Sequence, residues 1–85
     1  MKTFEYTIKD ELGIHARPAG MLAKAAKALD SEITITKGDK AVGAAKLMAL
    51  MGLGVKCGDT ITVTINGGDE DAFQKAMKEF LENNL

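Results

Sequence analysis

The hydrophobic and polar positions of the chain change period along its length, and each period predicts one kind of element. Near the N-terminus Phe4, Tyr6 and Ile8 alternate with polar residues, which is the two-residue period of a half-buried strand. After a turn, the apolar positions from Ala16 to about Leu29 recur with the 3.6-residue period of a helix. The predicted core arc of this helix consists of Pro18, Leu22, Ala25, Ala26 and Leu29.

Two further strands and a short helix are predicted in the middle of the chain. Isoleucines and threonines alternate over residues 33–36, and a polar turn at residues 37–40 leads into a short strand through Val42. This pattern predicts a hairpin. Residues 46–51 favour a short helix, which ends at the glycines that follow it.

The last part of the chain predicts one more strand and one more helix. Ile61, Val63 and Ile65 alternate with threonines, so we expect them to point inward. Asp69 is placed to cap a helix, and the acidic residues after it favour the first helical turn. The predicted buried stripe of this helix consists of Phe73, Ala76, Met77, Phe80 and Leu81.

These elements give the order β-α-β-β-α-β-α, which predicts an α+β fold in two layers. The strands are short and amphipathic, so we expect a four-stranded antiparallel sheet with one face covered by the three helices. A chain of 85 residues has room for one domain, here residues 1–85.

Composition and charge exclude several functions. The net charge is −1, so no basic field indicates nucleic acid as a partner. No apolar leader or membrane-spanning run is present, and a single cysteine, Cys57, fits a reducing compartment, so we expect a cytoplasmic protein without membrane insertion. One histidine and one distant cysteine cannot supply a metal ligand set, and no cofactor motif occurs.

The residues that could take part in a reaction lie in the segment Gly13-Ile14-His15-Ala16-Arg17-Pro18. His15 lies where a turn becomes a helix, and Pro18 suits a first helical turn. We expect the backbone N–H groups of Ala16 and Arg17 to point out near the imidazole and form an anion site. The Arg17 guanidinium can bind a phosphate through two hydrogen bonds. The pattern alone also fits a capping or surface histidine.

The segment GIHARPA at residues 13–19 resembles the active-site motif of the HPr family of phosphocarriers, and the Leu47-Met48 and Leu53-Gly54 pairs match as well. The resemblance covers nearly the whole chain and implies an open-faced β-sandwich. It implies that His15 is phosphorylated on Nδ1 by enzyme I, which takes its phosphate from phosphoenolpyruvate. The phosphoryl group then passes to a histidine of a sugar-specific IIA domain, so the protein is a covalent carrier and not an enzyme with its own turnover.

The sequence also contains a second group of residues, which is a candidate surface for binding partner proteins. Part of it lies on the helical arc opposite the core, and part lies on the short second helix. From the pattern alone, its methionines fit a core as well as a docking surface. The resemblance favours a docking surface for enzyme I and IIA domains on a monomeric protein. The residues concerned are Gly20, Met21, Lys24, Lys27, Lys46, Leu47, Met48 and Met51.

One position departs from the family. Many Gram-positive members carry a regulatory serine at the start of the short second helix, where this chain has Lys46, preceded by Ala45. We therefore expect no serine phosphorylation there. Two alternatives are a relative that regulates only by binding, which the presence of His15 and Arg17 disfavours, and a carrier for a specialised relay.

Overall fold

The computed structural model describes all residues from Met1 to Leu85, and its elements follow the predicted order. The sheet has the strand order β1-β4-β2-β3, and every neighbouring pair is antiparallel. Two of the three pairings, β1 with β4 and β4 with β2, join strands that are far apart in the sequence, and only β2 and β3 are consecutive. The elements are β1 (Lys2–Thr7), α1 (Ala16–Lys27), β2 (Glu32–Lys37), β3 (Lys40–Gly43), α2 (Leu47–Gly52), β4 (Thr60–Asn66) and α3 (Glu70–Asn84).

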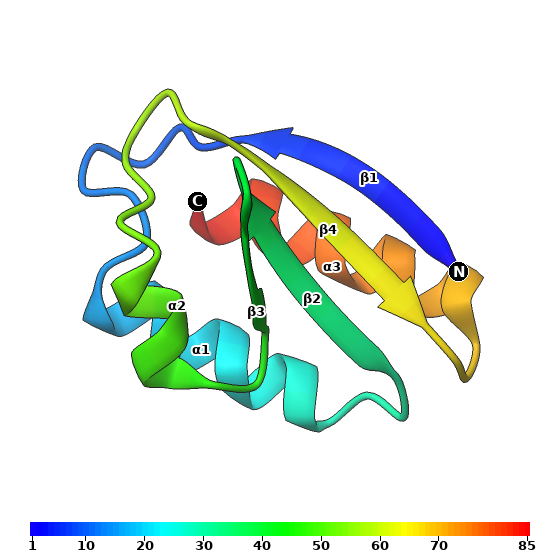
Figure 1. Ribbon diagram of the computed structural model, residues 1–85. Helices are drawn as coiled ribbons and strands as arrows, with labels where there is room; N and C mark the ends of the chain where they lie inside the picture. Colours follow the sequence, from blue (N-terminus) through cyan, green and yellow to red (C-terminus); the bar gives the residue numbers. More distant parts are fainter.

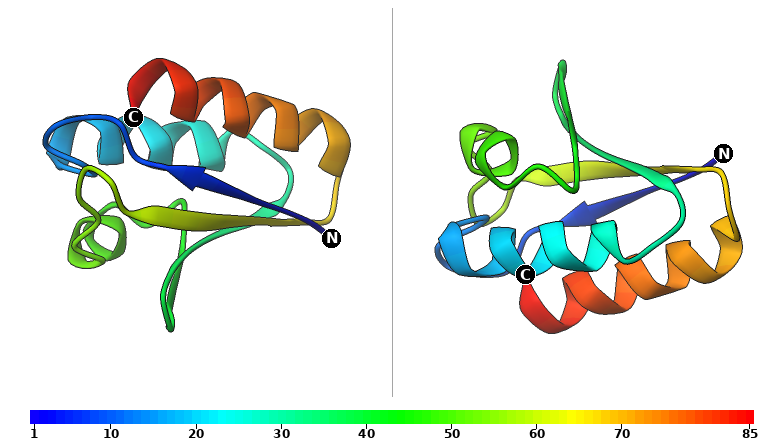
Figure 2. Two further views of the ribbon diagram at one scale, coloured as in Figure 1. Left: turned by 90° about the horizontal axis from the view of Figure 1, so that it is seen from above. Right: turned by 90° about the horizontal axis from the view of Figure 1, so that it is seen from below.

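The helices do not contribute equally to the second layer (Figure 1). Helices α1 and α3 lie side by side on one face of the sheet, and both views of Figure 2 show them on the same side. The short α2 lies to one side of this layer, where it contacts α1 and β3. The predicted four-stranded antiparallel sheet with three helices is confirmed, and α2 lies apart from the layer that α1 and α3 form (Figure 2).

One hydrophobic core fills the space between the sheet and the helices. The inward residues of the two central strands are all buried, as predicted. The opposite face of the sheet carries threonines that pair across strands, such as Thr34 with Thr64, which stabilises the pairing. The largest fully buried side chains are Ile8, Leu22, Ile35, Leu50, Ile61, Ile65, Met77, Leu81 and Val63.

Two details of the predicted helical faces are wrong. Ala76 is exposed, because the buried face of α3 is centred between Met77 and Leu81 and Ala76 lies well outside it at 100° per residue. Ala19 and Ala23 of α1 are buried although they lie outside the predicted arc. Helix α1 is covered by α2 as well as by the sheet, so its buried arc is wider than an amphipathic pattern indicates.

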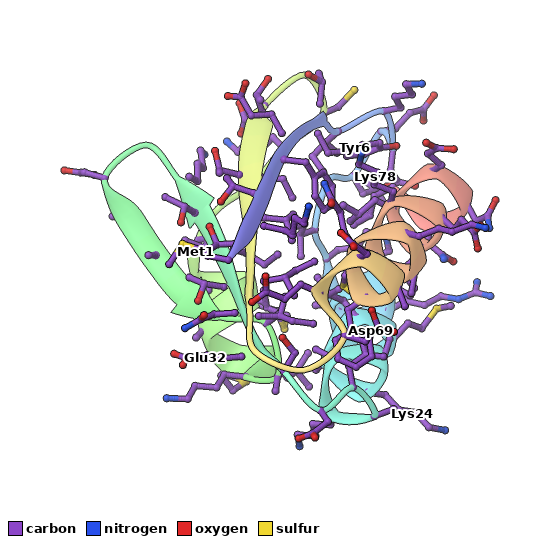
Figure 3. All side chains as sticks on the ribbon, turned by 90° about the vertical axis from the view of Figure 1, so that its right-hand side faces the viewer. Met1, Tyr6, Lys24, Glu32, Asp69 and Lys78 are labelled. Carbon is purple, nitrogen blue, oxygen red and sulfur yellow. The ribbon has the colours of Figure 1, made fainter.

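Tyr6 on β1 points toward α3 (Figure 3), and its hydroxyl is buried without a hydrogen-bond partner. Burial, with a smaller contribution from Glu82, raises the pKa of Tyr6. Because an unpaired buried hydroxyl is destabilising, we expect Tyr6→Phe to raise the free energy of unfolding by about 1 kcal/mol. Urea unfolding measures this change, and Tyr6→Leu, which loses the ring, is expected to destabilise. A loss of stability in Tyr6→Phe would contradict the assignment of an unpaired hydroxyl.

Candidate functional site

The loop before α1 is held against the segment that follows α2. Gly13 adopts a φ of 68°, and a Cβ at this position would collide with the carbonyl oxygen of Val55. The Gly13 amide donates to the carbonyl of Asp10 at 3.0 Å, and the Ile14 amide donates to the carbonyl of Val55 at 3.1 Å. Only glycine has both the backbone freedom and the small size that this close approach requires. The motif glycine therefore sets the position of the residues after it.

The segment behind this loop is itself fixed by a charged cluster. The Asp59 carboxylate accepts a hydrogen bond from the Lys56 amide at 2.8 Å and pairs with Lys37 Nζ at 3.0 Å. The hydrogen bond from the Lys56 amide, with the Lys37 ammonium beside it, holds the pKa of Asp59 below its ordinary value. Lys37 Nζ also donates to the carbonyl of Gly54 at 2.8 Å. The sheet, the segment and the His15 loop are thus connected by polar contacts.

His15 is the N-cap residue of α1 by its backbone, while its side chain makes no capping hydrogen bond. The His15 carbonyl accepts from the Ala19 amide at 2.9 Å, which begins the helix. The amides of Ala16 and Arg17 occupy the first two helical positions, where no intrahelical acceptor exists, and no other atom accepts from them. Two free donors and the positive end of the helix dipole therefore lie next to the imidazole.

His15 and Arg17 both line an open pocket at the start of α1. The ring is about one-third exposed, so a partner can reach it. Nε2 of the ring lies 3.6 Å from Oδ2 of Asp10. The lining residues are Asp10, His15, Arg17, Pro18, Met21, Asn83 and Asn84.

Three of these lining residues were not predicted from the sequence. Asn83 and Asn84 come from the end of α3, which reaches the loop because the Leu85 carbonyl accepts from the amides of Lys9 and Asp10 at 2.6 and 2.7 Å. Only the tertiary fold brings this end of α3 to His15. Asp10 had a local signal, because an acidic residue shortly before the motif glycine lies within reach of the histidine in a tight loop.

Of the residues predicted to dock partners, Met21 lines this pocket, and the others lie on α1 and on or just before α2, which contacts α1. Met21, Leu47, Met48 and Met51 are exposed, which removes the alternative that these methionines form the core. The lysines at 24, 27 and 46 are also exposed, while Gly20 is half-buried. Leu12, in the loop before His15, is 70% exposed and is an apolar side chain that the sequence pattern did not indicate.

Comparison with known proteins places this site in a family. The family model described as "PTS HPr component phosphorylation site" matches residues 2–83 of the chain. The chain belongs to the HPr family. HPr proteins are phosphocarriers of the phosphotransferase system, and the GIHARPA resemblance is thereby confirmed.

Individual HPr proteins agree with this assignment in sequence and in structure. The phosphocarrier protein HPr of Mycoplasma genitalium is 41% identical over 85 residues, which is 99% of this chain and 97% of the relative. HPr of Lysinibacillus sphaericus is 38% identical and covers 95% of this chain and 92% of its own length. The crystal structure of HPr-C-His from Thermoanaerobacter tengcongensis superposes with a TM-score of 0.92 at 34% identity, covering 99% of this chain and 94% of that one.

Two further properties of this HPr-family chain bear on its chemistry. No group of three His, Cys, Asp or Glu side chains lies close enough to hold a metal ion. None of the helices combines the length and the apolar character needed to cross a membrane.

Proposed function

We propose that His15 accepts a phosphoryl group on Nδ1 from phosphorylated enzyme I and passes it to a histidine of a IIA domain. The observation that carries the proposal is that three features lie together at the start of α1. These are the part-exposed imidazole, the Arg17 guanidinium and the free amides of Ala16 and Arg17 at the start of α1. Incubation with enzyme I, phosphoenolpyruvate and a IIA domain tests it, because label should appear first on this protein and then on the IIA domain.

The chemistry of these groups suits both the attack and the phosphorylated product. A neutral imidazole has a lone pair on one nitrogen, which can attack phosphorus. The transferred group brings negative charge to the beginning of α1, where free N–H groups and the helix dipole stabilise anions. Arg17 can add two parallel hydrogen bonds to phosphoryl oxygens. The protein then acts as a carrier, since each transfer needs a donor protein and an acceptor protein.

We further propose that residues of α1 and α2, together with Lys46, form one docking surface for enzyme I and for IIA domains. It combines four exposed apolar side chains with three exposed lysines. Lysines of one sign increase the rate of encounter with an acidic partner, while methionines adapt to more than one partner shape. The docking surface consists of Gly20, Met21, Lys24, Lys27, Lys46, Leu47, Met48 and Met51.

A negative charge on the docking surface is expected to weaken binding without unfolding the protein. Met48 is 78% exposed, so Met48→Asp removes little buried area and should change the melting temperature only slightly. We expect its affinity for enzyme I to fall about tenfold or more, the size of a typical interface hot spot. Titration calorimetry measures the affinity. Ala72→Asp, in the first turn of α3, adds the same charge on another element and serves as the control.

Two outcomes of the Met48→Asp experiment would contradict the expected result. Unchanged affinity would remove Met48 from the docking surface. A large fall in the melting temperature would mean that the side chain supports the core, in conflict with its exposure.

We also propose that the chain is not regulated by a serine kinase at the start of α2. Lys46 is the N-cap residue of α2, and its side chain makes no capping hydrogen bond. Neither Lys46 nor Ala45 has a hydroxyl that a kinase could phosphorylate. Lys46 instead extends the basic part of the docking surface, at the place where a phosphoserine would repel an acidic partner.

Incubation with an HPr kinase and ATP is expected to leave the mass of the protein unchanged. Lys46→Ser supplies the missing hydroxyl and is the matched comparison. A serine at the N-cap is also expected to stabilise the protein by about 0.5 to 1 kcal/mol, because it can accept from a free amide of α2. An acid-stable phosphate on the unaltered protein would contradict the proposal.

A further inference from the structure

The loop that carries the motif glycine also places a carboxylate beside the histidine. Oδ2 of Asp10 lies 3.6 Å from Nε2 of His15, and both side chains are about one-third exposed. We propose that Asp10 is a positioning residue that holds the proton of His15 on Nε2, so that the lone pair lies on Nδ1. This inference rests on the proposed function, in which His15 is the phosphoryl acceptor.

The Asp10 carboxylate is fixed in this place by its own neighbours. Its Oδ2 atom accepts from the Leu12 amide at 3.0 Å, which closes a turn of the kind that aspartate forms with the backbone two residues on. The Asp10 amide donates to the Leu85 carbonyl at 2.7 Å, and its carbonyl accepts from the Gly13 amide at 3.0 Å. Backbone contacts on both sides therefore hold the carboxylate toward the ring before any partner binds.

A carboxylate beside one ring nitrogen selects a tautomer. A neutral imidazole carries its proton on either nitrogen, and the nitrogen that faces a negative charge is favoured as the N–H donor. The separation of 3.6 Å is longer than a direct hydrogen bond, so the interaction in this structure is electrostatic. A small rotation of the ring would bring the N–H group within hydrogen-bond distance of the carboxylate.

The same contact favours the transfer step itself. The Nδ1 lone pair forms the N–P bond, the electron pair of the broken bond to phosphorus returns to the donor, and the Nε2 proton stays on the ring. Positive charge then develops on the imidazole, and a carboxylate at Nε2 stabilises it, as the aspartate does in a Ser-His-Asp triad. Arg17 and the free amides interact with the phosphoryl oxygens, while Asp10 interacts with the opposite side of the ring.

Three variants separate this role from simpler effects of charge or folding. Asp10→Asn keeps an oxygen for the Leu12 amide and removes the charge, and Asp10→Ser supplies a hydroxyl that can accept from the same amide without reaching the ring. Glu11→Gln removes the same charge from the neighbouring residue, which is exposed, and is the matched control. The ¹⁵N shifts of the His15 ring report the tautomer at a pH at which the ring is neutral. Phosphorylation at saturating enzyme I and phosphoenolpyruvate gives the rate.

In the unaltered protein we expect the Nε2–H tautomer to predominate. Both Asp10 variants should shift the ring toward the Nδ1–H tautomer and slow phosphorylation about two- to fivefold, the effect of one partly exposed ionic interaction. Glu11→Gln should change neither quantity. An unchanged tautomer, an unchanged rate, or an equal loss in Glu11→Gln would overturn the role of Asp10.

Failure of the proposed function gives a different result. If the unaltered protein takes no phosphate from enzyme I, His15 is not the acceptor in this relay. The tautomer measurement needs no partner protein, so in that case it still decides whether Asp10 holds the Nε2 proton.

Discussion

His15→Ala is expected to fold normally and to accept no phosphate from enzyme I. The chain has one histidine, so no other residue can form a phosphohistidine. The folded state should survive, because the imidazole makes no capping hydrogen bond and is not part of the hydrophobic core. We expect labelling to fall below the detection limit, while the melting temperature changes by no more than a few degrees.

The His15→Ala experiment needs a control for folding and docking. An unchanged amide spectrum and an unchanged affinity for enzyme I would show that only the acceptor is lost. His15→Gln, which keeps a polar side chain of similar length, should behave in the same way. Labelling retained in either variant would place the acceptor at another residue.

Arg17→Ala is expected to fold normally and to slow transfer by about 10- to 100-fold. Loss of one preorganised donor to a developing oxyanion costs about 100- to 1,000-fold in a closed active site. The Arg17 side chain is exposed, so solvent reduces its contribution. The free amides of Ala16 and Arg17 remain in the variant, which is why transfer should be slowed and not abolished.

Arg17→Lys separates the geometry of the guanidinium from its charge. A lysine keeps the charge but lacks the planar pair of donors, so it should restore only part of the rate. Rates at saturating enzyme I distinguish a slower chemical step from weaker docking. Equal rates for Arg17→Ala and the unaltered protein would remove Arg17 from the mechanism.

The elements of this fold were predictable because each has a local signal. The alternation of apolar and polar residues predicted the strands, and the 3.6-residue period of apolar positions predicted α1 and α3. Asp69 ends the loop before α3 and accepts from the Ala72 amide at 3.2 Å, as its position in the sequence predicted. The misassigned Ala76 shows the limit of such signals, because a pattern of apolar residues gives the arc of a helix but not the centre of its contact with the sheet.

The site was only partly predictable, because some of its residues come from a distant part of the chain. His15, Arg17 and the free amides belong to one continuous motif, so spacing along the chain was enough to bring them together. Asn83 and Asn84 reach the pocket from the far end of the chain, and only the packing of α3 against β1 brings them there. Their contribution could not be predicted before the fold was known.

The proposed docking surface shows a third limit of prediction from the sequence. Met21, Met48 and Met51 suit a core and an interface equally well, since methionine is apolar and flexible. Their exposure in the folded chain separates these possibilities. Exposure excludes the core for these methionines, so the docking role proposed for them depended on the fold, whereas the role proposed for His15 followed from the motif.

The most direct test of the account is the mass and chemistry of the protein after incubation with enzyme I and phosphoenolpyruvate. We predict one added phosphoryl group, which is lost in acid and retained in base, as expected for a phosphohistidine. Proton and phosphorus NMR should locate it on Nδ1 of His15. No adduct, an acid-stable adduct, or a phosphoryl group on any other residue would contradict the account.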